Sequence, residues 1–186
     1  EEHAQPLAVE WFEAPDEVGR ALDRYVALER TTWKGDAGFS VGGTAEQRGF
    51  YRDLVDRSAP KGRVAICFLR SGRDDAAAAL IFRSINVVYG SQICYAPEFG
   101  KFSPGIVLNV EIMKRHFDSH FTAFDFLALQ GGTTDGRFRE NWATESQQLA
   151  TITIFKRGFR DRLYRIEKRI HRAKERMFAS RRNEVE

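Results

Sequence analysis

The sequence has few cysteines, and they do not form a recognisable pattern. Only 2 of its 186 residues are cysteines, which excludes a disulfide framework. Cys67 and Cys94 both lie in apolar, strand-like runs, with no His or Cys near them at metal-ligand spacing. We therefore expect two buried free thiols in a reducing compartment, a cytoplasmic location and no bound metal.

Long hydrophobic runs are also missing. No apolar run approaches the length that spans a bilayer, and the acidic start of the chain has neither a basic nor an apolar signal region. The sequence thus predicts neither a transmembrane segment nor a signal peptide. The first residue is Glu rather than Met, which fits a piece of a longer protein. A length of 186 residues with 42% hydrophobic content is enough for one domain with a real core.

Basic residues are concentrated near the end of the chain. Residues 156–182 hold 12 Lys and Arg against 3 acids, whereas residues 1–155 hold 17 basic and 21 acidic residues. We therefore divide the chain into a domain at residues 1–156 and a basic amphipathic helix at residues 157–186. The helix carries an apolar seam at heptad spacing, formed by Phe159, Leu163, Ile166, Ile170, Ala173 and Met177.

The seam has several interpretations. It can pack on its own domain or on a neighbouring domain, with the basic side chains in water. The alternatives are a homodimer, an anionic membrane surface or RNA. Because no aromatic stacking platform accompanies the charge, nucleic acid is the weaker choice.

The hydrophobic periods predict an α+β order of elements before this tail. We expect a strand at 8–12, a helix at 16–30 capped by Asp16, and a second helix with a Thr44–Gln47 capping box and Phe50, Leu54 and Val55 facing inward. The glycine-rich segment 35–43 between the helices is typical of a flexible loop. Residues 64–69, 76–83 and 85–95 read as an antiparallel meander, and residues 149–155 as a last strand.

Residues 95–126 are the most informative stretch. Ser103 is in an N-cap position, Pro104 stands at the first helical position and Gly105 follows. The predicted helix has an apolar stripe at Ile106, Val110, Met113 and Phe117, ends near His116, Ser119 and His120, and leads into a parallel strand at 121–129. We expect His116 and His120 to be surface or helix-cap residues, because they lie at the far end of the helix from its anion-favouring start.

Two features of this stretch allow a functional and a structural interpretation. The amides of Gly105, Ile106 and Val107, with the helix dipole, can hold a phosphate, or the Ser-Pro-Gly sequence can be only a good helix start, which is the commoner case. Asp125 is the one acid in an apolar strand. It can serve chemistry, or it can pair with a neighbouring Arg at the strand end.

Several of these motifs together resemble a known family. They are Trp33-Lys34-Gly35, Phe50 with Leu54, the meander, Tyr95-x-Pro-x-Phe with Phe102-Ser103-Pro104-Gly105, Phe124-Asp125-Phe126, and Phe138-Arg139 before Trp142. In this order they resemble the acetyltransferase family named for the cellulose-biosynthesis protein CelD, within the GNAT superfamily and akin to the FemAB aminoacyl transferases.

The resemblance implies a GNAT fold, a mixed and mostly antiparallel sheet flanked by helices. In this fold the sheet splays after its fourth strand, and acyl-CoA lies in the gap with its pyrophosphate on the following helix start. The implied donor-binding residues are Lys101, Ser103, Gly105, Ile106 and Val107. The sequence departs from the superfamily's usual Gln/Arg-Gly-x-Gly/Ala signature, with only Gly100 and Gly105 around Lys101.

The resemblance also implies an N-acyltransferase that moves an acyl group, acetyl first, from acyl-CoA to an amine of a sugar, a polysaccharide precursor or an amino-acid derivative. Backbone N–H groups near residues 94–96 would polarise the carbonyl. Asp125 is the candidate base or substrate orienter, and Tyr95 the candidate acid toward the thiolate.

Other candidate site residues follow from the same resemblance. Arg139 stands where the family commonly has Lys; it can hold a carbonyl or carboxylate but cannot transfer a proton. Trp33, Lys34, Phe138 and Trp142 are the expected acceptor-binding residues. The alternatives are FemAB-like aminoacyl transfer from tRNA and a non-catalytic binding or scaffolding half of a longer protein.

Overall fold

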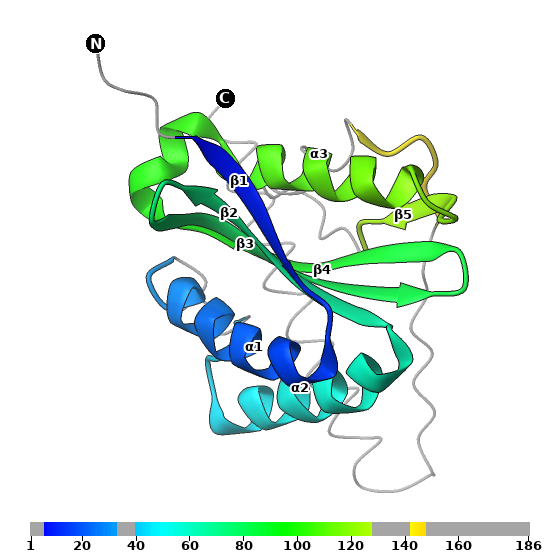
Figure 1. Cartoon of the computed structure of the whole chain (residues 1–186), viewed down its shortest axis with the longest axis horizontal. Coiled ribbons are helices and arrows are strands. Elements are labelled where there is room, and N and C mark those ends of the chain that lie inside the picture. Colours follow the sequence, from blue (N-terminus) through cyan, green and yellow to red (C-terminus); the bar gives the residue numbers. More distant parts are fainter. Residues whose placement is uncertain (1–5, 33–39, 128–141, 148–186) are drawn as a thin grey trace, which may run out of the picture. The chain divides into compact units, whose positions relative to one another are not determined.

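A computed structural model of the chain describes residues 6–32, 40–127 and 142–147 (Figure 1). The chain divides into two compact units, residues 1–144 and 145–186, and the fold below belongs to the first. The predicted strand at 149–155, the tail helix and the boundary at 156 lie outside the described residues.

One mixed sheet organises this unit (Figure 1). Its neighbours run in the order β1-β2-β3-β4-β5, antiparallel except for the parallel pair β4 and β5. The elements in chain order are β1 (Leu7–Phe12), α1 (Pro15–Glu29), α2 (Ala45–Ser58), the 3₁₀ turn η1 (Ala59–Lys61), β2 (Val64–Ser71), β3 (Asp74–Ser84), β4 (Val87–Tyr95), the 3₁₀ segment η2 (Pro97–Phe102), α3 (Pro104–Phe117) and β5 (Ala123–Asp125). The predicted α+β class, meander and parallel crossover are confirmed.

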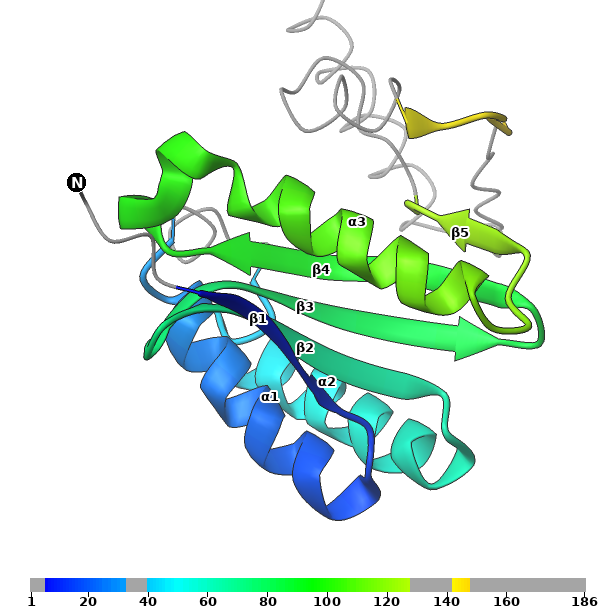
Figure 2. The ribbon, with the colours of Figure 1, turned by 45° about the horizontal axis from the view of Figure 1, so that its top comes forward.

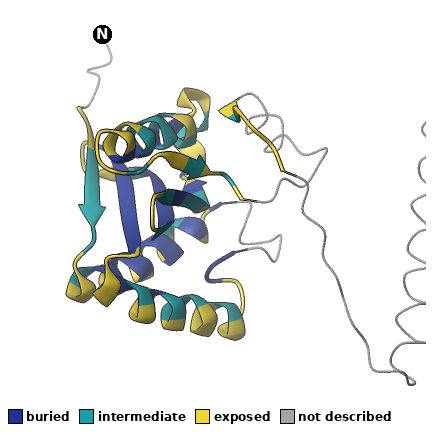
Figure 3. Ribbon diagram, turned by 90° about the vertical axis from the view of Figure 1, so that its right-hand side faces the viewer, coloured by how far each residue is buried: buried dark blue, intermediate teal, exposed yellow. Residues whose placement is uncertain are grey.

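Helices cover both faces of the sheet. Figure 2 shows α1 and α2 on one face and α3 on the other. Along β2, Ile66 and Phe68 pack in the core under α1 and α2, whereas the alternating Cys67 and Leu69 pack under α3. The buried band in Figure 3 is therefore two cores that share one sheet.

The central strand β3 has unusually small side chains. Its residues 76–79 are four consecutive alanines, all buried. Ala78 belongs to the core under α1, and Ala77 and Ala79 belong to the core under α3. Side chains of one carbon on both faces let both helices approach the backbone of β3 closely.

The first two helices partly follow the prediction. The Thr44 hydroxyl accepts from Gln47 N at 3.1 Å, and Gln47 Oε1 accepts from Thr44 N at 3.0 Å, so the capping box of α2 is confirmed. The predicted cap Asp16 is wrong, because Ala14 is the N-cap of α1 and Pro15 begins the helix. Phe50 does not face inward but is 63% exposed, because the buried side of α2 is centred on Val55.

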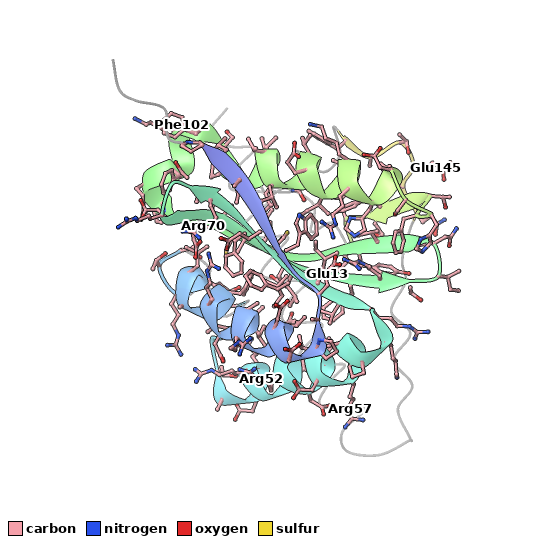
Figure 4. The ribbon with its side chains drawn as sticks, in the orientation of Figure 1. Glu13, Arg52, Arg57, Arg70, Phe102 and Glu145 are labelled. Atoms are coloured by element: carbon pink, nitrogen blue, oxygen red, sulfur yellow. The ribbon has the colours of Figure 1, made fainter. Side chains whose placement is uncertain are left out.

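An ion-pair network holds α1 to the sheet. Arg24 donates to Asp75 Oδ2 at 2.7 Å and to Glu10 Oε2 at 2.9 Å, and Arg70 donates to Glu10 Oε1 at 2.6 Å. Arg70, near the end of β2, is labelled in Figure 4. Burial alone would raise the pKa of Glu10, but the hydrogen bonds from Arg70 and Arg24 outweigh it and lower that pKa.

The apolar stripe predicted for α3 is wrong. Ile106 and Phe117 are 40% and 49% exposed, and the helix buries Leu108, Ile112 and His116, each four residues after the last. The helix is therefore rotated relative to the predicted face. The buried face includes a histidine, His116, which is 3% exposed and so is missed by a prediction from apolar residues alone.

The ring of His116 is fixed in one neutral form. Arg83 Nε donates to His116 Nε2 at 3.0 Å, so Nε2 is an acceptor, and Nδ1 must carry the proton that it shares with Ile112 O at 2.7 Å. Burial lowers the pKa of His116, and the nearby Arg83 and Arg115 lower it further against the opposing effects of Ile112 O and Glu13. Glu13 in turn accepts from Arg83 and from Arg115.

We expect His116 to make stability depend on pH. The unfolded state takes up a proton near pH 6.5, the ordinary histidine pKa, whereas the folded state resists it, so stability is complete above that pH and falls as the pH drops below it. Denaturant titrations at pH 7.5 and 5.5 should show a lower midpoint at pH 5.5 for the wild type and a smaller loss for His116→Gln. The exposed His120→Gln is the control, and an equal loss in both variants would contradict the assignment.

Candidate functional site

The strands β4 and β5 pair over a short distance and then part. Their register contains three pairs, Val87 with Ala123, Val88 with Phe124 and Tyr89 with Asp125, and β4 continues to Tyr95. On its other edge β4 stays paired with β3 through a bulge at residue 91, where Leu80 faces Gln92 and Ile81 faces Gly90. Among the described residues, the pairing of β4 with β5 thus ends at Tyr89 and Asp125.

A glycine marks the point of separation. A Cβ atom at Gly90 would lie 2.9 Å from the ring of Phe124, so a larger residue would displace that ring. Phe124 also packs against the core under α3. Sequence reasoning missed Gly90, although a lone glycine inside a strand pattern is a known sign of a bulge or a close approach.

The start of α3 lies beside the end of β4, as Figure 2 shows. A Cβ atom at Gly105 would be 3.7 Å from the ring of Tyr95, which is 39% exposed. Lys101 Nζ lies 4.8 Å from the centre of the Phe102 ring, and that ring is 61% exposed (Figure 4). The helix start is therefore bordered by aromatic rings and one ammonium group.

The amides of this helix start differ from the prediction. Ser103 has φ 52° and ψ 49° and makes no side-chain cap, so its predicted hydroxyl cap is wrong. Its carbonyl accepts from Ile106 N at 2.9 Å and from Val107 N at 3.3 Å. Of the three amides predicted to hold an anion, two are thus used inside the helix, which leaves Gly105 N–H, the helix dipole and Lys101 as the groups that fit an anion.

The predicted carbonyl-polarising amides near the end of β4 also need correction. Ala96 N donates to Ala76 O at 3.0 Å. Cys94 lies two residues before Ala96 and pairs with Ala78 in the same antiparallel register. Because amides two residues apart in a strand point the same way, the amide of Cys94 also points toward β3. The alternation directs the amides of Ile93 and Tyr95 toward the other edge, where β5 departs.

Asp125 is exposed and shapes the end of β5. Its Oδ1 accepts from Leu127 N at 2.7 Å, and Leu127 has a φ of 60°, an Asx-type turn that ends the strand. Among the described residues Asp125 forms no ion pair, so the predicted pairing with an Arg is not found there. Because Phe124 packs toward α3, the side chain of Asp125 lies on the opposite face, the side of α1 and α2.

The structure does not bring Tyr95 and Asp125 together. Asp125 is opposite Tyr89, and Tyr95 follows six residues later along β4, a separation of roughly 15–20 Å. Tyr95 also shares its face with Ile93, which packs under α3. One reacting centre cannot contact both side chains.

The other predicted site residues are only partly described. Trp142 is 38% exposed, and Trp33, Lys34, Phe138 and Arg139 lie outside the described residues. In the ranges that the structure describes, no three His, Cys, Asp or Glu side chains are grouped as metal ligands. No helix in the same ranges combines the length and apolar character that crossing a bilayer requires.

Comparison with known proteins identifies the class. The family described as the acetyltransferase (GNAT) domain matches residues 1–138, and the chain belongs to this family. It is therefore an acyltransferase enzyme with acetyl-CoA, or a related acyl-CoA, as its co-substrate. No curated protein matches the sequence.

Solved structures share the fold at low sequence identity. An aminoglycoside acetyltransferase from an uncultured soil metagenomic sample, in complex with sisomicin, is 8% identical with a TM-score of 0.56, over 81% of this chain and 97% of that chain. The aminoglycoside N-acetyltransferase AAC(6')-Iy, in complex with CoA, is 11% identical with a TM-score of 0.56, over 85% and 99%. The ribosomal-protein-alanine N-acetyltransferase of Brucella melitensis is 7% identical with a TM-score of 0.54, over 81% and 100%.

We expect Gly105→Asp to weaken CoA binding by roughly tenfold or more, because a carboxylate would stand where the helix start favours an anion. The control is Gly49→Asp, a helical glycine with no atom within 4 Å of its added Cβ. Isothermal titration with CoA measures both affinities, and circular dichroism checks the fold. Equal affinities in two folded variants would remove the helix start of α3 from the donor site.

Proposed function

We propose that the chain is an N-acetyltransferase that transfers the acetyl group of acetyl-CoA to an amine of a sugar, a polysaccharide precursor or an amino-acid derivative. The observation that carries this proposal is that the described pairing of β4 with β5 ends at Tyr89, whereas the far end of β4, at Tyr95, lies against a helix start without a side chain at Gly105. Strand β4 thus leads from an anion-favouring end at Gly105 to the carboxylate of Asp125.

The donor side of the site is the end of β4. Gly105 N–H, the dipole of α3 and Lys101 are the groups that would hold the pyrophosphate, and Tyr95 would lie against the donor rather than act as the acid. From Tyr95 back to Gly90 the strand runs about 16 Å, a span that an extended pantetheine arm can follow. The bound donor supplies the acetyl group as a thioester.

The acceptor side is the face that carries Asp125. Its carboxylate is exposed beside the point where the strands part, on the side of α1 and α2. A carboxylate there attracts an ammonium group and can take its proton as the amine attacks. Arg139 would hold a carbonyl or carboxylate of the acceptor, and Trp33, Lys34, Phe138 and Trp142 would border it.

Names of similar structures support an amine as the acceptor. Two of them are named aminoglycoside acetyltransferases and one is named a ribosomal-protein-alanine N-acetyltransferase. Within the family we propose a CelD-like relation akin to FemAB.

Two buried free thiols fit a reducing, cytoplasmic compartment. The seam of the basic tail would serve a dimer or a neighbouring domain.

A direct assay tests this function. The chain is incubated with acetyl-CoA and either glucosamine, sisomicin or an amino-acid amide, and the acetylated product is detected by mass spectrometry. We expect acetylation of at least one amine together with stabilisation by acetyl-CoA. Stabilisation by aminoacyl-tRNA instead would favour FemAB-like transfer, and stabilisation by neither ligand would favour a binding module.

We expect Asp125→Asn to lower kcat by roughly a hundredfold while the affinity for acetyl-CoA stays unchanged. Asn keeps an oxygen that can accept from Leu127 N, so the turn that ends β5 survives. Asp125→Ala removes that acceptor as well, and its denaturant midpoint separates the structural role from the chemical one. Full activity of Asp125→Asn would exclude proton transfer by Asp125.

A further inference from the structure

A carboxyl group that the proposed reaction does not use is buried at the end of α1. Glu29 is 1% exposed. Its Oε2 accepts from Gly42 N at 3.2 Å, and its Oε1 accepts from Tyr25 OH at 3.4 Å. Removing a carboxyl group from water is costly unless its oxygens keep hydrogen bonds, and here both oxygens are used.

One of these contacts fixes the loop that precedes α2. Residues 40–42 are buried, and a Cβ atom at Gly42 would lie 2.3 Å from Val26 Cγ1. The loop is therefore pressed against α1 at a position that only glycine fits. The Glu29–Gly42 hydrogen bond ties the loop backbone to the helix at this contact.

The other contact leads to β4. The Tyr25 hydroxyl also lies beside the thiol of Cys94, and burial raises the pKa of Tyr25 well above its ordinary value, so the hydroxyl keeps its proton and donates. Tyr51 of α2 lies near Glu29, and its hydroxyl accepts from Gln92 Nε2 at 3.4 Å. Glu29 is thus the centre of a polar cluster that joins α1, the loop and α2 to the parted half of β4.

This cluster lies on the acceptor side of the proposed site. Cys94 packs in the core under α1 and α2, the face on which Asp125 is exposed. Figure 2 shows the end of α1, the end of β4 and the start of α3 at the same end of the sheet. The loop and the helix start of α3 therefore share one end of the sheet but lie on opposite faces, and we expect a shift of the loop to act on the face that carries Asp125.

We propose that Glu29 is a positioning residue, which holds the loop at residues 40–43 against α1 and β4 and thereby sets the affinity for the acceptor amine. The effect on the acceptor rests on the proposed function, whereas the hold on the loop does not. Glu29 acts through Gly42 and Tyr25 and touches neither substrate.

Glu29→Gln tests the proposal with little change of shape. An amide keeps only one accepting oxygen, so Glu29→Gln either turns its NH₂ toward Gly42 N–H and breaks that contact, or turns it toward the Tyr25 hydroxyl and reverses the direction of that hydrogen bond. We expect hydrogen exchange of the peptide covering residues 40–44 to become about tenfold faster. With glucosamine as the probe acceptor, we expect its KM to rise about tenfold while the KM for acetyl-CoA changes less than about twofold.

Two further variants control this experiment. Tyr25→Phe removes the donor to Oε1 but keeps the Gly42 contact, so it should speed loop exchange less than Glu29→Gln and covers the case in which Glu29→Gln does not fold. Asp56→Asn makes the same chemical change at an exposed position of α2 and should change neither readout.

The outcomes separate this proposal from the proposed function. Unchanged exchange at residues 40–44 in folded Glu29→Gln, or equal weakening of acceptor and acetyl-CoA, would overturn the role of Glu29. If the wild type acetylates no amine, the proposed function fails, while the exchange result still confirms or overturns the hold of Glu29 on the loop.

Discussion

The site depends on the unequal pairing of the two edges of β4. One edge stays bonded to β3 through a bulge, and the other pairs with β5 for only three residues. The pairing stops at Gly90, where the Phe124 ring occupies the space of a side chain. Because β3 holds the strand along its whole length, β4 keeps its position beyond the three residues that pair with β5.

In the proposed site the two faces of the sheet have separate tasks. On the α3 face, Tyr95 and Gly105 would surround the donor, and on the other face Asp125 and the loop held by Glu29 would surround the acceptor. Each face also buries a titratable side chain, His116 under α3 and Glu29 beside α1. In both cases the buried polar group links a helix to neighbouring elements through specific hydrogen bonds.

The sequence predicted the elements better than the faces of the helices. The meander, the capping box at Thr44 and the helix start at Pro104 follow from local chemistry, and all three are present. The rotation of α3 could not be predicted, because burial of His116 depends on Arg83, 33 residues away in the chain. The positions of Asp125 and Tyr95 relative to one another depend on where β4 and β5 part. That point is set by the tertiary contact between Gly90 and Phe124, which local sequence patterns do not contain.

The alanines of β3 have a mechanical consequence. A helix that rests on large side chains can shift by a fraction of an ångström when those side chains change rotamer, whereas a Cβ atom has no rotamers. Both α1 and α3 contact β3. The strand at residues 76–79 is therefore a rigid surface against which a helix packs on each face. Because no side-chain rotamer of these alanines can take up a displacement, we expect a shift of one helix to be transmitted to the backbone of β3 and so to the helix on the other face.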